Sequence, residues 1–67
     1  MDTIKRVQDL MKERDMNLCV LTKKCGISYS TIQTTARRGG QLSVETIERI
    51  CLGLGITLKD FFDSSYL

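Results

Sequence analysis

The sequence predicts an all-α protein built from five short helices. Apolar residues recur three or four positions apart, which is the period of a helix with one buried face. Small polar residues precede these segments, and glycine follows three of them. Val, Ile, Tyr and Phe are too scattered for the alternation of a strand. With 67 residues and no linker-like stretch, residues 1–67 are expected to form a single domain.

The first two helices are expected in the N-terminal part of the chain. Asp2 or Thr3 can cap the first helix, because a short polar side chain accepts a hydrogen bond from a free N–H group of the first turn. Asn17 can cap a second helix over residues 18–25, and Gly26 can adopt the left-handed conformation that ends it. The apolar residues expected to face inward are Ile4, Val7, Leu10, Met11, Leu18, Leu21 and Cys25.

The third helix is expected over residues 29–37, with Ser28 as its cap and Gly39-Gly40 at its end. Its helical period separates a buried face from a polar face. The buried face is expected to hold Ile32, Thr35 and Ala36, and the polar face Tyr29, Ser30, Gln33, Thr34 and Arg37.

The last two helices follow an exposed loop. Ser43 can cap the fourth helix, Glu45 suits the positive end of its dipole, and Gly55 ends it. Thr57 and Asp60 resemble a capping box for a short fifth helix. The expected core residues of these helices are Val44, Ile47, Ile50, Cys51 and Leu54, followed by Leu58, Phe61 and Phe62, and Tyr66 and Leu67 are further core or interface candidates.

Charge is unevenly distributed along the chain. Residues 16–44 contain four Lys and Arg and no Asp or Glu, so they carry +4, while the remaining six basic and eight acidic residues carry −2. A surface that meets phosphate groups must lack carboxylates, because these would be repelled. The acid-free segment therefore favours a polyanionic partner. Lys23 and Lys24 are expected to add general attraction.

Several classes of function are disfavoured by the composition. The chain has three Cys, no His and no Cys-x-x-Cys pair, so neither a metal site nor a cysteine nucleophile with a histidine base is expected. Cys25 and Cys51 are expected to be buried, and Cys19 to be partly exposed. No apolar run approaches the roughly 20 residues that span a bilayer. We expect no enzymatic activity, no cofactor and no membrane partner.

Three segments resemble the helix-turn-helix domain of Cro/cI-type phage repressors, also called the xenobiotic-response-element family. Residues 21–32 (LTKKCGISYSTI) match the helix-turn-helix, and residues 42–47 (LSVETI) and 54–62 (LGITLKDFF) match the fourth and fifth helices. The similarity covers residues 2–63 without a gap. It implies a compact five-helix lambda-repressor-like DNA-binding domain, with its central helix-turn-helix at about residues 18–37.

The resemblance also implies where DNA is bound. In this family the second helix of the motif lies in the major groove, and the first helix crosses the phosphate backbone. Transferred position by position, the base contacts fall on Tyr29, Ser30, Gln33 and Thr34, and the phosphate contacts at the start of the first helix fall on Asn17 and Leu18. The complete expected DNA-binding set is Asn17, Leu18, Ser28, Tyr29, Ser30, Thr31, Gln33, Thr34, Arg37, Arg38 and Gln41.

Individual residues leave alternatives open. The amide of Gln33 suits bidentate contact with adenine, but it can also belong to a solvated helix face. Tyr29 can touch a thymine methyl group or a phosphate, or its ring can cover the turn. Arg37 and Arg38 can bind phosphate, interact with the helix dipole, or both. No Arg opens the helix, which favours A·T-rich or shape-dependent recognition.

Three positions depart from the family pattern. Many members pair an Arg with a Glu where this chain has Met11 and Ala36, and we expect these two side chains to pack as a buried apolar pair. Thr22 replaces the usual Ala, so its hydroxyl needs a partner. Leu18 replaces a frequent Gln, which leaves its backbone N–H as the phosphate donor.

Two functions are compatible with these features. The leading hypothesis is a sequence-specific transcriptional regulator of double-stranded DNA, a cytoplasmic bacterial or phage-encoded repressor that binds as a homodimer to two half-sites about 34–36 Å apart. The alternative is a protein-interaction module, such as an antitoxin or partner-binding subunit, that keeps the fold with weak or no DNA binding.

Overall fold

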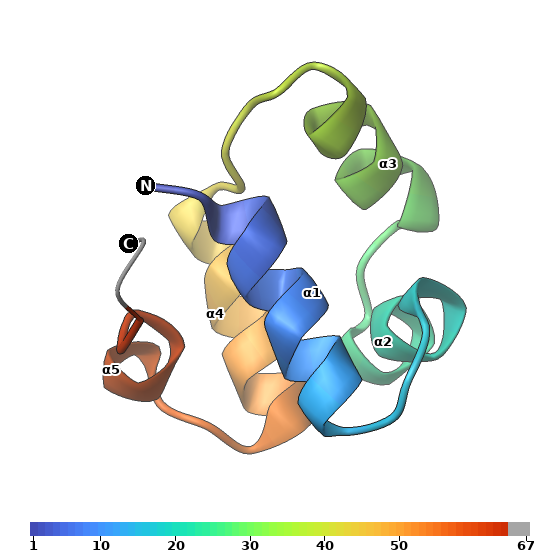
Figure 1. Ribbon diagram of the computed structural model, residues 1–67. Helices are drawn as coiled ribbons and strands as arrows, with labels where there is room; N and C mark the ends of the chain where they lie inside the picture. Colours follow the sequence, from blue (N-terminus) through green and yellow to red (C-terminus); the bar gives the residue numbers. More distant parts are fainter. Residues whose placement is uncertain (65–67) are drawn as a thin grey trace.

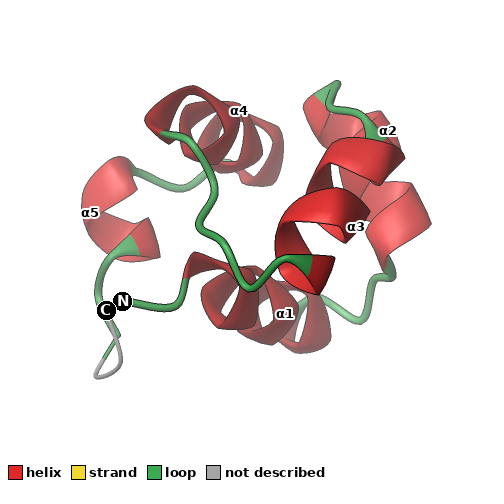
Figure 2. Ribbon diagram, turned by 90° about the horizontal axis from the view of Figure 1, so that it is seen from above, coloured by secondary structure: helices red, strands yellow, loops and turns green. Residues whose placement is uncertain are grey.

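The computed structural model describes residues 1–64, and these form five α-helices with no strand (Figure 1). The helices are α1 (Thr3–Glu13), α2 (Leu18–Cys25), α3 (Tyr29–Arg37), α4 (Val44–Leu54) and α5 (Leu58–Phe61). The predicted all-α fold class is confirmed. α2 and α3 lie together on one side of the molecule and α5 lies on the opposite side, with α1 and α4 between them (Figure 2).

A single apolar cluster fills the space between the helices. Leu21, Ile50 and Phe61 have no exposed surface at all, so each contributes its whole side chain to the core. A chain of this size buries only about 60% of its extended surface, and its stability therefore depends on a few such residues. The buried apolar residues are Val7, Leu10, Leu21, Cys25, Ile32, Leu42, Ile47, Ile50, Cys51 and Phe61.

Most of the predicted helix caps are present. The side chains of Asn17 and Ser43 accept hydrogen bonds from backbone N–H groups in the first turns of α2 and α4. Thr57 and Asp60 form the expected capping box at α5. Asp2, rather than Thr3, caps α1. These local contacts fix where the helices begin.

Thr3 instead connects α1 to the loop between α3 and α4. The residue is fully buried. Its hydroxyl donates to Gln41 Oε1 at 2.8 Å and accepts from the N–H of Leu42 at 2.9 Å. Its own N–H also donates to Gln41 Oε1, at 2.8 Å. This Thr3 latch holds the middle of the loop against the start of α1.

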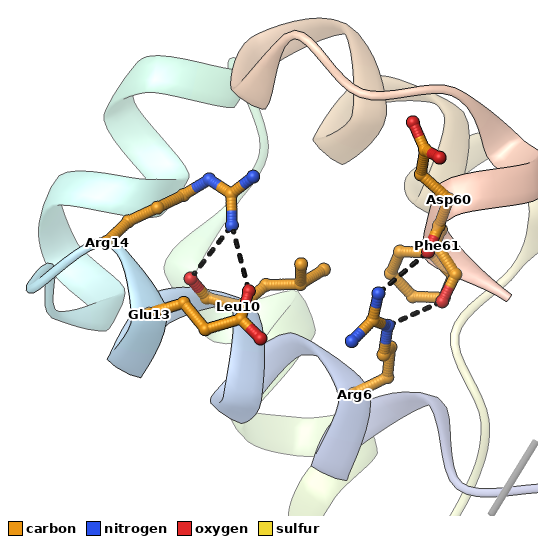
Figure 3. A network of polar contacts seen from close by, with 6 residues as sticks. All are labelled: Arg6, Leu10, Glu13, Arg14, Asp60 and Phe61. Carbon is orange, nitrogen blue, oxygen red and sulfur yellow. Dashed lines mark hydrogen bonds and ion pairs between the residues drawn. The ribbon is translucent and has the colours of Figure 1, made fainter. Parts of the chain in front are cut away.

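Arg6 joins α1 to the C-terminal end of α5. Its Nε and Nη2 atoms donate to the backbone carbonyls of Phe61 and Asp60, at 2.5 and 2.7 Å (Figure 3). Carbonyl groups in the last turn of a helix have no partner within the helix. The positive charge of a guanidinium group also interacts favourably with the negative end of the helix dipole, which lies at this terminus. Arg6 thereby secures the shortest helix, which has only four residues.

Several residues expected in the core are more exposed than predicted. Val44 is 68% exposed, because it shares the outward face of α4 with Glu48 and Leu52 at intervals of four residues. Leu58 and Phe62 of the α5 region are also exposed, at 39% and 40%. The periodic pattern predicted all three as core residues, and this is wrong because they lie at the edge of the apolar stripe, which no neighbouring helix covers among the described residues.

The prediction that Met11 and Ala36 form a buried pair is wrong, because Ala36 is not buried. Ala36 is exposed and Met11 is half-buried. Both line a groove of about 240 Å³ between α1 and α3. The short alanine side chain does not fill the space that separates it from α1, so the groove stays open. The hydroxyl group of the buried Thr22 has the hydrogen-bond partner that it was expected to require, because it donates to the carbonyl of Cys19 at 3.1 Å.

Helices α2 and α4 approach each other closely where Gly53 of α4 meets Cys25 of α2. A Cβ atom at position 53 would lie 2.9 Å from Cys25 Cα and still closer to its Sγ. Real Cβ atoms do not approach a backbone atom so closely. Only glycine therefore allows this separation of α2 and α4. The sequence analysis assigned no role to Gly53.

We predict that Gly53→Ala destabilises the domain. Alanine favours a helix interior over glycine by about 1 kcal/mol, so an unobstructed site would become more stable. Here the added methyl group overpacks the contact with Cys25, which typically costs about 1–3 kcal/mol. Thermal unfolding measures the sign directly. Lys12→Ala is the control, because Lys12 is exposed on α1 and its truncation should change the free energy of unfolding by at most about 0.5 kcal/mol. A raised melting temperature for Gly53→Ala would contradict the close contact.

Candidate nucleic-acid interface

The turn between α2 and α3 depends on Gly26. This residue adopts the left-handed conformation, with φ of +66°, which costs other L-residues free energy. Its N–H and that of Ile27 both donate to the carbonyl of Thr22, which closes the end of α2. Ile27 then packs against the core. The chain is thereby redirected into α3, so that the two helices form a helix-turn-helix.

The structure brings most of the predicted DNA-binding residues onto the outer surface of this motif. In the first two turns of α3, Gln33 and Thr34 are half-buried and the other predicted contacts are exposed. Asn17 and Leu18 lie together at the start of α2, where Asn17 Oδ1 accepts from Val20 N at 2.9 Å. The exposed predicted residues at α3 are Ser28, Tyr29, Ser30, Thr31, Arg37 and Arg38.

Ser28 occupies the expected cap position of α3, but its side chain makes no capping hydrogen bond. The expectation of a side-chain cap is therefore wrong. Its hydroxyl is instead 2.8 Å from the hydroxyl of Ser30, and the two groups share a hydrogen bond at the surface. The first-turn N–H groups of α3 consequently have no side-chain acceptor. Helix N-termini in this state attract phosphate.

Two further side chains on α3 are bonded to each other. Gln33 Nε2 donates to the hydroxyl of Tyr29 at 2.8 Å. The two residues are four positions apart, so they lie one above the other on the same face of the helix. Tyr29 is 48% exposed, and its ring is accordingly accessible at the surface.

The basic side chains around the motif are available to a ligand. Lys23 and Lys24 in the last turn of α2, and Arg37 and Arg38 at the end of α3, are all exposed. Within residues 1–64 none of the four forms an ion pair, whereas Arg14 and Arg49 each pair with a glutamate. Their positive charge is therefore not neutralised by neighbouring carboxylates.

Gln41, predicted to belong to a backbone-contacting loop, also has a structural contact within the domain. Its side-chain oxygen is occupied by the Thr3 latch. The residue therefore positions the loop after Arg37 and Arg38, and only its amide N–H groups remain for other partners. Thr3 is the residue that the sequence analysis missed here. No sequence signal identifies it, since the bonded residues are 38 positions apart.

Two of the three cysteines are buried. Burial raises the pKa of the Cys25 and Cys51 thiols, which disfavours the nucleophilic thiolate. Cys19 is exposed, as expected. Among the described residues, no group of three or more His, Cys, Asp or Glu side chains is arranged to hold a metal ion. Over the same part of the chain, no helix is long and apolar enough to cross a membrane.

Comparison with known protein families agrees with this geometry. The family model for Cro/C1-type HTH DNA-binding domains matches residues 6–64. The chain belongs to the family of Cro/C1-type helix-turn-helix DNA-binding domains, which confirms the resemblance seen in its sequence. Membership supports DNA as the partner and transcription regulation as the role, in a family that is normally non-enzymatic. Neither a curated protein nor a solved structure shows a significant match.

We predict that Arg37→Ala combined with Arg38→Ala weakens binding to all duplexes and lowers its salt dependence. Each lost phosphate contact should reduce the slope of log K against log salt by about 0.9. Titrations at several salt concentrations measure this slope. Lys59→Ala is the control for a lost charge, because Lys59 belongs to α5 on the opposite side of the molecule. An unchanged slope in the double variant would assign the phosphate contacts to Lys23, Lys24 and the helix N-termini.

Proposed function

We propose that the protein is a sequence-specific transcriptional regulator of double-stranded DNA that represses by occupying an operator. The observation that carries this proposal is the outer face of α3. It presents hydroxyl and amide groups from a 29-residue segment without a carboxylate, residues 16–44, between unpaired basic side chains. Occupancy of an operator requires no catalysis and no cofactor. The proposal includes a cytoplasmic location in a bacterium or a phage-infected cell.

The proposed contacts divide into two groups. Gln33, Ser30 and Thr34 contact base edges in the major groove, where a glutamine amide matches adenine and a hydroxyl group suits several bases. The absence of an arginine at the start of α3 supports a preference for A·T-rich sites. The remaining residues position the protein on the phosphates, through side chains or through free N–H groups, and they are Asn17, Leu18, Ser28, Thr31, Arg37 and Arg38.

We further propose that two copies bind together through α4 and α5. Leu52, Leu58 and Phe62 are exposed apolar side chains of this region, at 77%, 39% and 40%. The α5 region lies on the side of the molecule opposite α3 (Figure 1). A two-fold axis there would leave both α3 helices facing outward, as recognition of half-sites about 34–36 Å apart requires. Tyr66 and Leu67, also expected as interface candidates, lie outside the described residues.

A protein-interaction module is the second candidate function. Leu18 favours it, because an apolar, half-buried side chain stands at a position where the family has a phosphate contact. The absence of a guanine-binding arginine on α3 favours it as well. Under this alternative, changes on the outer face of α3 would alter the binding of a protein partner, such as a toxin, rather than binding of a duplex.

Selection of bound sequences from a random duplex pool tests the proposed function. We expect enrichment of an A·T-rich site whose two halves are related by two-fold symmetry. No enrichment above a pool carried through without protein would contradict sequence-specific binding and favour the interaction module. A single asymmetric half-site would contradict the dimeric arrangement alone.

We predict that Gln33→Ala relaxes the preference at one base position of the selected site. Loss of a bidentate contact costs about 1–3 kcal/mol on the preferred duplex, whereas binding to unrelated duplexes should barely change. Competition titrations with duplexes altered one base pair at a time measure the effect. Thr46→Ala removes a polar group from α4, outside the proposed DNA-binding surface, and provides the control. Wild-type preference at every position in Gln33→Ala would show that Gln33 is only a surface residue.

We predict that Leu52→Ser combined with Phe62→Ser separates the two copies. Leu52 is 77% exposed, whereas Phe62 is 40% exposed and its ring contacts that of the buried Phe61, so thermal unfolding is used to establish that the double variant is folded. Joint binding of two modules commonly raises the overall affinity about 10²–10⁴-fold, and this gain should be lost on a two-half-site duplex while half-site binding persists. Sedimentation of the complex with DNA measures the stoichiometry. Two copies bound to the duplex with undiminished affinity would place the interface elsewhere.

A further inference from the structure

The side-chain amide of Gln33 is held by the hydroxyl of Tyr29. Gln33 Nε2 donates to this hydroxyl at 2.8 Å, one helical turn apart on α3. Tyr29 is 48% exposed and Gln33 is half-buried. The hydrogen bond therefore lies at the surface that is proposed to meet DNA, and one of its ends is a proposed base-contacting group.

Gln33 is also confined by the groove between α1 and α3. It lines this groove beside the apolar side chains of Leu18, Ile32 and Ala36, and Gln8 of α1 is the other polar residue of the lining. The hydrogen bond that the amide of Gln33 makes is the one to Tyr29. A glutamine free in solvent loses rotamer freedom when a ligand orders it, and a side chain that is already ordered does not. The bond to Tyr29 and the groove together restrict Gln33 before any ligand is present.

We propose that Tyr29 is a specificity-determining positioning residue that orients the amide of Gln33 for contact with adenine. This inference rests on the proposed function, because it assigns a role within the same DNA-binding surface. A glutamine amide has two N–H hydrogens and one oxygen acceptor. With one hydrogen directed at Tyr29, the other hydrogen and Oε1 remain for adenine N7 and the adenine amino group.

The same orientation disfavours guanine. Guanine presents two acceptors, N7 and O6, at this edge of the base pair. An amide that can rotate freely could turn its nitrogen toward O6, but the bond to Tyr29 opposes that rotation. Gln33 Oε1 would then face the guanine O6 atom, and both are acceptors. Tyr29 therefore sharpens the choice between adenine and guanine without touching the base.

Binding measurements on four proteins test this role. Wild type, Tyr29→Phe, Gln33→Ala and the double variant are titrated against the duplex that wild type selects from a random pool. The same titrations are made with the three duplexes that differ only at the base pair where Gln33→Ala loses its preference. We expect Tyr29→Phe to weaken binding to the selected duplex by about 2- to 12-fold, the scale of one net hydrogen bond. Tyr29→Phe should also bind the four duplexes with more nearly equal affinities than wild type does. When Gln33 is already replaced by Ala, Tyr29→Phe should cause little further loss of affinity.

Thr46→Ala is the control for the loss of one hydroxyl group outside the proposed DNA-binding surface. The hydroxyl of Thr46 lies in α4 and is bonded to that of Ser43. Thr46→Ala should therefore leave the preference at the Gln33 base pair in place. In the free ¹⁵N-labelled protein, the side-chain amide resonances of Gln33 should shift in Tyr29→Phe and not in Thr46→Ala.

Two outcomes would overturn the inference while the proposed function stands. One is an equal loss of affinity by Tyr29→Phe for all four duplexes, which is the behaviour of an independent phosphate contact. The other is a loss that adds in full to that of Gln33→Ala, because residues acting as one unit are not additive. Failure of the wild type to select any sequence would overturn the proposed function and this inference together.

Discussion

The contact between Gly53 and Cys25 is the constraint on which the DNA-binding surface depends. It sets how closely α4 approaches α2, and α2 is the first helix of the helix-turn-helix motif. α3 itself is anchored lightly, since Ile32 is its only buried residue among those described. The orientation of α3 is therefore determined largely by the position of α2 and by the turn at Gly26 that connects the two helices. The remaining positions of α3 can consequently vary in chemistry without disturbing the core.

The parts of the structure that could be predicted from sequence are those whose cause is local. Asn17, Ser43 and Thr57 cap helices by accepting hydrogen bonds from residues three positions along the chain, so composition and spacing are sufficient to find them. The central apolar stripe was predicted on the same basis. Its edges were not, because the exposure of Val44 and Ala36 depends on whether another helix happens to cover them.

The parts that could not be predicted join distant residues. Arg6 binds a carbonyl group 55 positions away, and helical periodicity contains no information on such pairs. The positions of the candidate site came from the family resemblance rather than from periodicity. The hydrogen bonds of these side chains are seen only in the structure. The hydroxyl group of Ser28, for example, is bonded to that of Ser30 and does not cap α3. The hydrogen bond between Tyr29 and Gln33 could be predicted only in part. A spacing of four residues on a helix brings the two side chains close enough to touch, but it does not require that they form a hydrogen bond.

The Thr3 latch has a consequence for the thermodynamics of DNA binding. It fixes the middle of the α3–α4 loop through three hydrogen bonds to the first residue of α1. The conformational entropy of that loop is thus lost when the chain folds, not when a duplex arrives. In the proposed complex, the side chains of Arg37 and Arg38 are ordered on binding, but the backbone of the loop after them is ordered beforehand. Under that proposal, affinity for phosphate at this end of the motif depends in part on a threonine outside the proposed DNA-binding set.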